Sequence, residues 1–308
     1  MGFGGGALIA SPLSSTLLET YASNPVDAIV PSFLTLGAIY LVSMMIGAFV
    51  VRLPPEGWQP EGWTPPTEEE TGDLQTTADV SAGSAIRTPQ FWMLWTVLFC
   101  NVTAGIGVLE QASPMIQDYF SWITPAAAAG FVGLLSLANM AGRIGWSSTS
   151  DYIGRKPIYM VYLGVGLVLY FVLAAFGATS LVLFLLVTVV ILSFYGGGFA
   201  TVPAYLKDMF GVAEVGAIHG RLLTAWSAAG IAGPLIINAI ADYQIAAGRT
   251  GADLYTLSLY IMVGVLAVGF VANLLVRPVD PSFHMVPGPE GEPEKESTAS
   301  GRAAGSES

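Results

Sequence analysis

The chain has 308 residues, of which 53% are hydrophobic and only 11% are charged, and its mean hydropathy is +0.63. A soluble domain carries about 25% charged residues, so this composition argues against an ordinary soluble protein. The net charge of −11 arises mostly from residues 53–90 and from the segment after Arg277, which we interpret as solvated acidic surface. We expect no nucleic-acid partner. The single cysteine, Cys100, excludes a disulfide within one chain.

Seven apolar stretches are each long enough to cross a bilayer, which requires around 20 residues of helix. A weaker, glycine-rich stretch covers residues 3–18 and predicts an eighth helix. The sequence therefore predicts an all-α membrane protein that contacts the lipid bilayer. The seven predicted spans are residues 31–51, 91–110, 125–147, 157–177, 181–204, 217–241 and 254–276.

The basic residues predict the orientation of these spans, because cytoplasmic loops are enriched in Lys and Arg. If the Asp151–Lys156 loop is cytoplasmic and the spans alternate, only Arg249 of the 11 basic residues faces outward. We therefore expect a multi-pass protein of the plasma membrane whose long linker and C-terminus are cytoplasmic. The residues on the cytoplasmic side are then Arg52, Arg87, Arg143, Arg155, Lys156, Lys207, Arg221, Arg277, Lys295 and Arg302.

Two predicted spans precede a long connection, and six follow it. The connection is rich in Pro, Gly and Glu, which is typical of a flexible linker. A six-helix unit after a long loop suggests one half of a two-fold transporter, preceded by the end of the other half. We predict four parts: 1–52, the end of a first half; 53–88, a cytoplasmic linker; 89–278, a six-helix half; and 279–308, a disordered acidic tail.

Arg143 lies inside the span predicted at 125–147, and a cation inside a membrane helix costs about 2.5–3.5 kcal/mol on insertion scales. Eight residues separate it from Asp151, so a continuous helix places it about 12 Å into the membrane. Asn139 and Ser136 share its helical face. The guanidinium matches a carboxylate, which predicts an anion-binding site near the midplane. The alternative is an arginine that reaches back to the interface.

Residues 151–156 read Asp-Tyr-Ile-Gly-Arg-Lys and resemble the D-x-x-G-R-[KR] loop motif of the major facilitator superfamily. Longer strings are similar to the oxalate:formate antiporter family, a relative of the monocarboxylate transporters. That resemblance implies twelve helices in a full-length member, of which this chain has the end of helix 5, helix 6 and the complete C-terminal six, with its start truncated. The strings are the Gly-Trp-Pro linker at 54–66 and residues 88–92, 101–105, 111–115, 195–201 and 223–226.

The resemblance implies that Arg143 binds a substrate carboxylate, since related transporters have an arginine at the matching helix-8 position. It implies that the motif residues form a gate whose ion contacts change between conformations; the alternative is that they only fix the inner face. We take the gate to be Asp151, Gly154, Arg155 and Lys156.

Tyr195 and Trp226 complete the candidate substrate site, although membrane tyrosines more often pack or lie at interfaces. Oxalate transporters of this family carry a second cation in helix 11, and residues 222–241 have no Lys or Arg. One cation suits one carboxylate, which favours a monocarboxylate such as formate, pyruvate or lactate over oxalate. Antiport and proton symport both remain open.

Other functional classes fit poorly. A retinal protein needs a lysine buried mid-helix, and none of the three lysines qualifies. A membrane enzyme needs clustered His, Asp or Glu, whereas the two histidines are well apart, so we expect no enzyme, no metal and no cofactor. The rival hypothesis is a non-transporting fragment, or a half-transporter that pairs with the missing first half or with a second copy.

Overall fold

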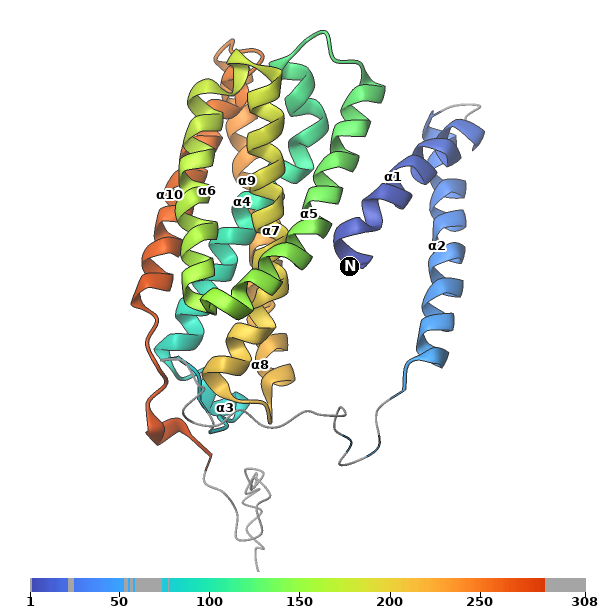
Figure 1. Cartoon of the computed structure of the whole chain (residues 1–308). Coiled ribbons are helices and arrows are strands. Elements are labelled where there is room, and N and C mark those ends of the chain that lie inside the picture. The colour runs from blue at the N-terminus through green and yellow to red at the C-terminus, as the bar shows by residue number, and fades with distance from the viewer. Residues whose placement is uncertain are drawn as a thin grey trace, which may run out of the picture.

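The computed structural model describes residues 2–21, 25–52, 55, 58, 74–76 and 78–285. Within these ranges the chain is helical, and the helices α4 to α7, α9 and α10 form an upright bundle beside which α1 and α2 stand (Figure 1). The α-helices are α1 Gly2–Tyr21, α2 Pro25–Val50, α3 Ala82–Ala85, α4 Pro89–Tyr119, α5 Pro125–Ile153, α6 Arg155–Phe176, α7 Leu181–Phe210, α8 Val215–Leu222, α9 Thr224–Ala246 and α10 Asp253–Leu275. The 3-10 helices are η2 Gly177–Thr179 and η3 Pro281–Phe283.

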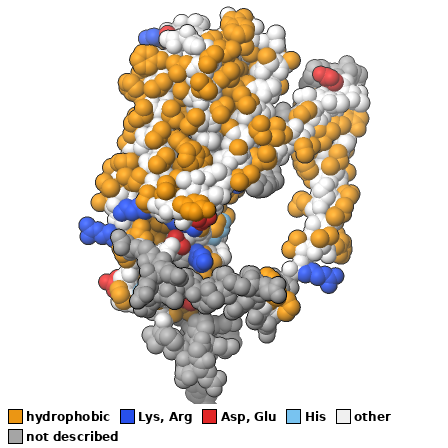
Figure 2. All heavy atoms as spheres, in the orientation of Figure 1, with side chains coloured by type: hydrophobic (Ala, Val, Ile, Leu, Met, Phe, Trp, Pro, Cys, Tyr) orange, Lys and Arg blue, Asp and Glu red, His pale blue; other side chains and the backbone are white. Residues whose placement is uncertain are grey.

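Seven helical segments of the described chain are long and apolar enough to cross a membrane. They match the seven predicted spans one for one, and α1 is not among them. Apolar side chains cover the flanks of the bundle, whereas Lys and Arg gather mainly at its lower end, where the 151–156 motif lies (Figure 2). We call this the motif end.

Local sequence signals start helices α4 and α5. Thr88 and Thr124 each precede a proline, and their hydroxyl oxygens accept hydrogen bonds from the N–H groups of Phe91 (3.2 Å) and Ala127 (3.3 Å). A threonine N-cap satisfies one of the free N–H groups of the first turn, and proline at the first helical position lacks an N–H to satisfy. These caps fix where α4 and α5 begin.

The bundle has α4 and α7 at its centre. Helix α4 packs against α9, α10, α5 and α7, while α5 packs along α7, and α6 packs along α10. Large side chains such as Tyr159, Tyr162 and Tyr205 are fully buried between them. Helix α1 packs on α5, and α2 packs on α1 with its apolar side chains mostly exposed. Helices α4 to α10 therefore pack mainly against one another, and α1 joins them through α5.

The span predicted at 217–241 is not one helix. The structure divides it at Leu223 into α8 and α9, and the Leu223 N–H still bonds to the carbonyl of His219 at 2.9 Å. The hydroxyl of Thr224, the first residue of α9, donates a hydrogen bond to the Arg221 carbonyl at 2.8 Å. A hydroxyl that bonds to a helix carbonyl competes with the regular backbone bonds and often bends a helix.

The linker prediction needs correction for residues 78–88, which pack against the motif end of the bundle. The Asp79 carboxylate accepts hydrogen bonds from the N–H groups of Val212 (2.7 Å) and Ala213 (2.9 Å), just after α7 ends. The Glu214 carboxylate accepts one from the Ala82 N–H (2.7 Å), at the start of α3. These charge-assisted bonds hold the segment in place, so it is not a flexible connection. Most of the predicted linker, residues 53–73 apart from 55 and 58, lies outside the described residues.

The tail prediction also needs correction at its start. Residues 279–285 are ordered: η3 forms there, Val80 and His284 make an antiparallel bridge, and the Met285 N–H bonds to the Asp79 carbonyl at 2.7 Å. The acidic composition of the tail did not predict this pairing, because backbone hydrogen bonds to the linker do not depend on side-chain type. Residues 286–308, including Lys295 and Arg302, lie outside the described residues.

Candidate functional site

Arg143 lies within α5, ten residues before that helix ends, and is half-buried. A rise of 1.5 Å per residue places it about 15 Å from the motif end of the helix. Its Nε donates a hydrogen bond to the Asn139 side-chain oxygen at 3.2 Å, one helical turn away. Its guanidinium also stacks over the Phe199 ring of α7, 4.9 Å from the ring centre. Two helices therefore orient this cation.

An aromatic cluster surrounds the arginine. Phe199 makes an edge-to-face contact with Trp226 of α9, with 5.9 Å between ring centres. Tyr195 precedes Phe199 by one turn of α7 and lies within electrostatic range of Arg143. The structure thus brings together four of the predicted site residues, Arg143, Asn139, Tyr195 and Trp226, from three helices.

Ser136 is the remaining predicted site residue, and Phe199 is an additional residue that the sequence did not predict. Ser136 is buried on α5, one turn beyond Asn139 and farther from the motif end. Phe199 was missed by the sequence reasoning, although it follows Tyr195 by four residues and must share its helical face. That spacing was the signal that could have found it. An aromatic ring beneath a guanidinium stabilises the cation by about 0.5–2 kcal/mol and restricts the orientation of the guanidinium.

Close contact between α5 and α7 makes this geometry possible. A β-carbon on Gly142 would lie 2.7 Å from the Ser193 Cα and closer still to the Ser193 carbonyl oxygen. One on Gly196 would lie 2.6 Å from the Asn139 side-chain oxygen and closer still to the Asn139 carbonyl oxygen. Side chains at these two positions would push the helices apart. Small residues let helix backbones approach closely, which brings Phe199 and Tyr195 within reach of Arg143.

The motif residues form a second cluster at the end of the bundle. Arg155 makes an ion pair with Asp151 at 2.6 Å and another with Asp208, in the last turn of α7, at 3.4 Å. It also donates to the Ser150 hydroxyl. Gly154 has a φ of 90°, a left-handed conformation that favours glycine, and this turn ends α5 and starts α6. The motif therefore connects α5, α6 and α7.

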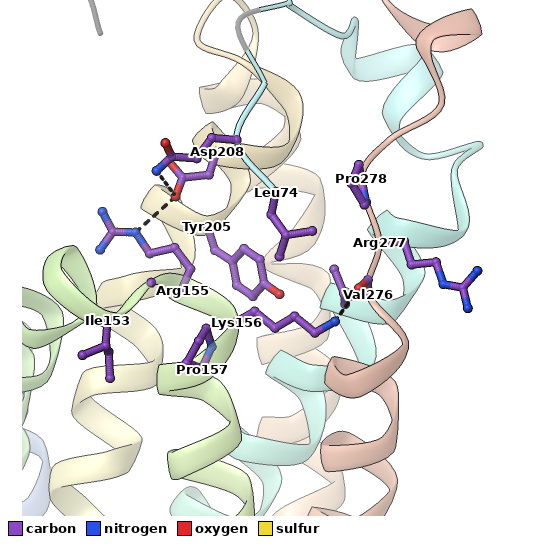
Figure 3. Close-up of a pocket in the computed structure, with 12 residues that line it drawn as sticks. Leu74, Ile153, Arg155, Lys156, Pro157, Tyr205, Asp208, Val276, Arg277 and Pro278 are labelled. Carbon is purple, nitrogen blue, oxygen red and sulfur yellow. Dashed lines mark hydrogen bonds and ion pairs between the residues drawn. The ribbon is translucent and has the colours of Figure 1, made fainter. Parts of the chain in front are cut away.

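Lys156 connects the same cluster to α10. Its Nζ donates to the Val276 carbonyl at 2.7 Å, and its own carbonyl accepts from the Asn273 amide at 3.0 Å. The Tyr205 hydroxyl of α7 donates to the Asn273 oxygen at 3.3 Å. The four predicted gate residues thus lie together where the ends of α5, α6, α7 and α10 meet. Figure 3 shows Arg155 and Lys156 there.

Asp208 is a functional candidate that the sequence reasoning missed. Its carboxylate binds Arg155 and accepts from the Gln75 amide at 3.5 Å, and its carbonyl accepts from the Thr76 N–H at 2.8 Å. The motif cluster is therefore also attached to the linker. An acid near the end of a membrane helix was the available signal, but its partners lie 53 and 133 positions away.

We expect Asp208→Asn to lower the free energy of unfolding by about 2 kcal/mol, because a largely buried charged hydrogen bond to Arg155 is lost. Asp151→Asn is the matched control, since Asp151 contacts the same arginine but its side chain is 61% exposed. An exposed ion pair contributes at most about 1 kcal/mol. Thermal unfolding in detergent measures both variants. Equal losses would contradict the central place given to Asp208.

A model of the Major Facilitator Superfamily matches residues 1–234 and, in a second overlapping match, residues 136–305. The chain belongs to the major facilitator superfamily. It is therefore a multi-pass membrane protein of a transporter family, with the all-α fold that its seven long apolar helices predicted. The identification rests on the chain as a whole, not on the D-x-x-G-R-[KR] loop alone.

Curated relatives of this superfamily member include two transporters with stated substrates. The oxalate:formate antiporter of Oxalobacter formigenes is 28% identical over 236 residues, which cover 75% of this chain and 51% of the relative. The apicoplast pyruvate carrier 1 of Toxoplasma gondii is 26% identical over 268 residues, which cover 71% of this chain and 48% of the relative. The chain thus spans about half the length of the curated relatives it matches.

Among solved structures, a bacterial homologue of the human lysosomal transporter Spinster, in an inward-facing and unoccupied conformation, has a similar fold. The TM-score is 0.55 at 17% identity, and the match covers 90% of this chain and 67% of the other. At this identity the likeness supports the fold alone. It agrees with the helical arrangement of Figure 1.

Proposed function

We propose that the chain is the C-terminal part of a secondary transporter for small carboxylates, with Arg143 as the group that binds the carboxylate. One observation carries the proposal. A cation lies within a membrane-spanning helix, and Asn139 and Phe199 hold it in one orientation. Such a residue is costly in a bilayer and marks a substrate or ion pathway.

The substrate class follows from the charge near the arginine and from the relatives. Helix α9, which contributes Trp226, contains no Lys or Arg, so Arg143 is the one cation that the described central cluster offers. One guanidinium fork fits one carboxylate. Formate and pyruvate, named in the relatives' descriptions, are monocarboxylates and fit better than oxalate. Exchange of two carboxylates and cotransport with a proton are both compatible with this site.

The proposed mechanism is alternating access, with the motif cluster as the gate at the cytoplasmic end. Helix α7 carries Tyr195 and Phe199 at the substrate site and Tyr205 and Asp208 at the gate. About 9 Å of helix lies between Phe199 and Tyr205, and about 20 Å lies between Tyr195 and Asp208. Movement of α7 on substrate binding therefore acts directly on the Arg155–Asp208 pair. Breaking and remaking such ion pairs is a common conformational switch.

A half-transporter that needs a partner is the second candidate. Arg143 lies on α5, the helix against which α1 packs, and the apolar side chains of α2 are exposed. In a two-half transporter the substrate is enclosed between the halves. A second polypeptide, or a second copy of this chain, then supplies the remaining wall of the site.

Uptake into proteoliposomes tests both candidates. We expect saturable uptake of radiolabelled formate, pyruvate or lactate in excess of oxalate uptake, either by this chain alone or by the chain joined to additional helices upstream. Activity only in the longer form supports the half-transporter. Absence of uptake in both forms, with the protein correctly inserted, contradicts carboxylate transport.

A further inference from the structure

The larger of the two best-formed cavities in the described part of the chain lies at the motif end, away from Arg143. Its volume is about 560 Å³. Helices α5, α6, α7 and α10 meet around it, and Leu74 of the linker closes one side (Figure 3). Nothing in the carboxylate site uses this space.

The cavity has a cationic wall. Arg155 and Lys156 line it, and Figure 3 shows the Lys156 side chain extended along it toward Val276. Helix α6 also starts here, and no side chain caps its first turn. The first N–H groups of a 22-residue helix favour an anion. Asp208 opposes these charges, although Arg155 binds and partly neutralises it.

Much of the remaining wall is apolar. Leu74, Ile153 and Val276 contribute hydrocarbon surface beside the two cations. The cavity lies where membrane-spanning helices end, which is the depth of lipid headgroups. A ligand that fits must combine a compact anion with an apolar portion. Basic pockets between membrane helices on the cytoplasmic side have this character and bind acidic headgroups.

We propose that this cavity binds a phosphate group, and that the apolar walls select the phosphate of an acidic phospholipid. The phosphate oxygens accept from Lys156 Nζ and from the backbone N–H groups of Arg155 and Lys156 at the start of α6. The acyl chains leave along the apolar side. Binding competes with the Val276 carbonyl for Lys156 and adds negative charge beside Arg155. An acidic lipid therefore weakens the contacts that hold the gate in the conformation of Figure 3.

Native mass spectrometry of the detergent-purified chain tests the site, with phosphatidylglycerol compared against phosphatidylcholine. We expect preferential retention of phosphatidylglycerol. Lys156→Gln should lower its affinity about fivefold, as expected for one cation near a membrane surface. The matched control is Lys207→Gln, which removes an exposed lysine at the same end that does not line the cavity. We expect that control to stay within about twofold of the wild type.

Two further variants keep the test valid if Lys156→Gln misfolds. Lys156→Arg retains the charge and should retain the lipid, whereas Leu74→Trp fills the cavity without removing a charge and should exclude it. A separate arm adds inorganic phosphate without acidic lipid. Protection against thermal unfolding by phosphate that depends on Lys156, without lipid retention, would support the phosphate site and assign a soluble ligand. Equal losses in the Lys156→Gln and Lys207→Gln variants, or no binding in either arm, would overturn the proposal.

This experiment does not depend on the carboxylate substrate, since its readouts are lipid retention and unfolding. Failure of transport and failure of lipid binding are therefore distinguishable.

Discussion

Replacement of Arg143 by Gln is expected to reduce the affinity for a carboxylate substrate by roughly 30-fold or more. The reason is that removing one member of a desolvated ion pair leaves the substrate's charge unpaired, which costs at least about 2 kcal/mol. Arg143→Lys should recover only part of this loss. Lysine keeps the charge, but it lacks the planar fork that Asn139 and Phe199 orient.

The measurement is the concentration dependence of uptake by proteoliposomes that contain each variant. Arg221→Gln is the matched control, because Arg221 is an exposed arginine in the last turn of α8. We expect that control to transport like the wild type. An Arg143→Gln protein with unchanged KM would contradict the role of Arg143 as the carboxylate ligand.

The second large effect is expected from Gly142→Ala, which should lower the free energy of unfolding by about 3 kcal/mol. The added β-carbon would lie 2.7 Å from the Ser193 Cα and closer still to the Ser193 carbonyl oxygen, and this backbone cannot move aside as a flexible side chain would. Helices α5 and α7 must then separate, and both the packing and the contact between Arg143 and Phe199 are weakened.

Gly145→Ala on the same helix is the control, because a β-carbon there has no neighbour within 4 Å. It should be neutral or slightly stabilising, since alanine favours a helix more than glycine does. Thermal unfolding in detergent separates the two variants. Equal behaviour would show that the close approach of α5 and α7 does not hold the bundle together.

The membrane helices and the central cation were predictable from sequence, because both depend on short-range patterns. A run of about 20 apolar residues predicts a span regardless of its neighbours. Arg143 and Asn139 are neighbours on any helix by their spacing of four. For the same reason the Asp151–Lys156 motif could be placed at the end of a helix before its partners were known.

The remaining features depend on how helices pack together. Phe199 lies at the candidate site because α5 and α7 approach each other closely at Gly142 and Gly196. Asp208 belongs to the motif cluster because α7 ends beside Arg155. It also accepts a hydrogen bond from the Thr76 N–H of the linker. No periodicity in the sequence encodes such contacts. The ordered segments 78–88 and 279–285 were missed for a similar reason, since polar composition predicts a loop whether or not it is held.

The most direct test of the central claim is equilibrium binding of a radiolabelled monocarboxylate to the purified protein, measured by scintillation proximity without transport. We compare the wild type with Arg143→Gln and Arg221→Gln, for formate, pyruvate and oxalate, with the chain alone and with additional upstream helices. The account predicts saturable monocarboxylate binding that Arg143→Gln abolishes and Arg221→Gln preserves. Equal binding by Arg143→Gln and the wild type would contradict it.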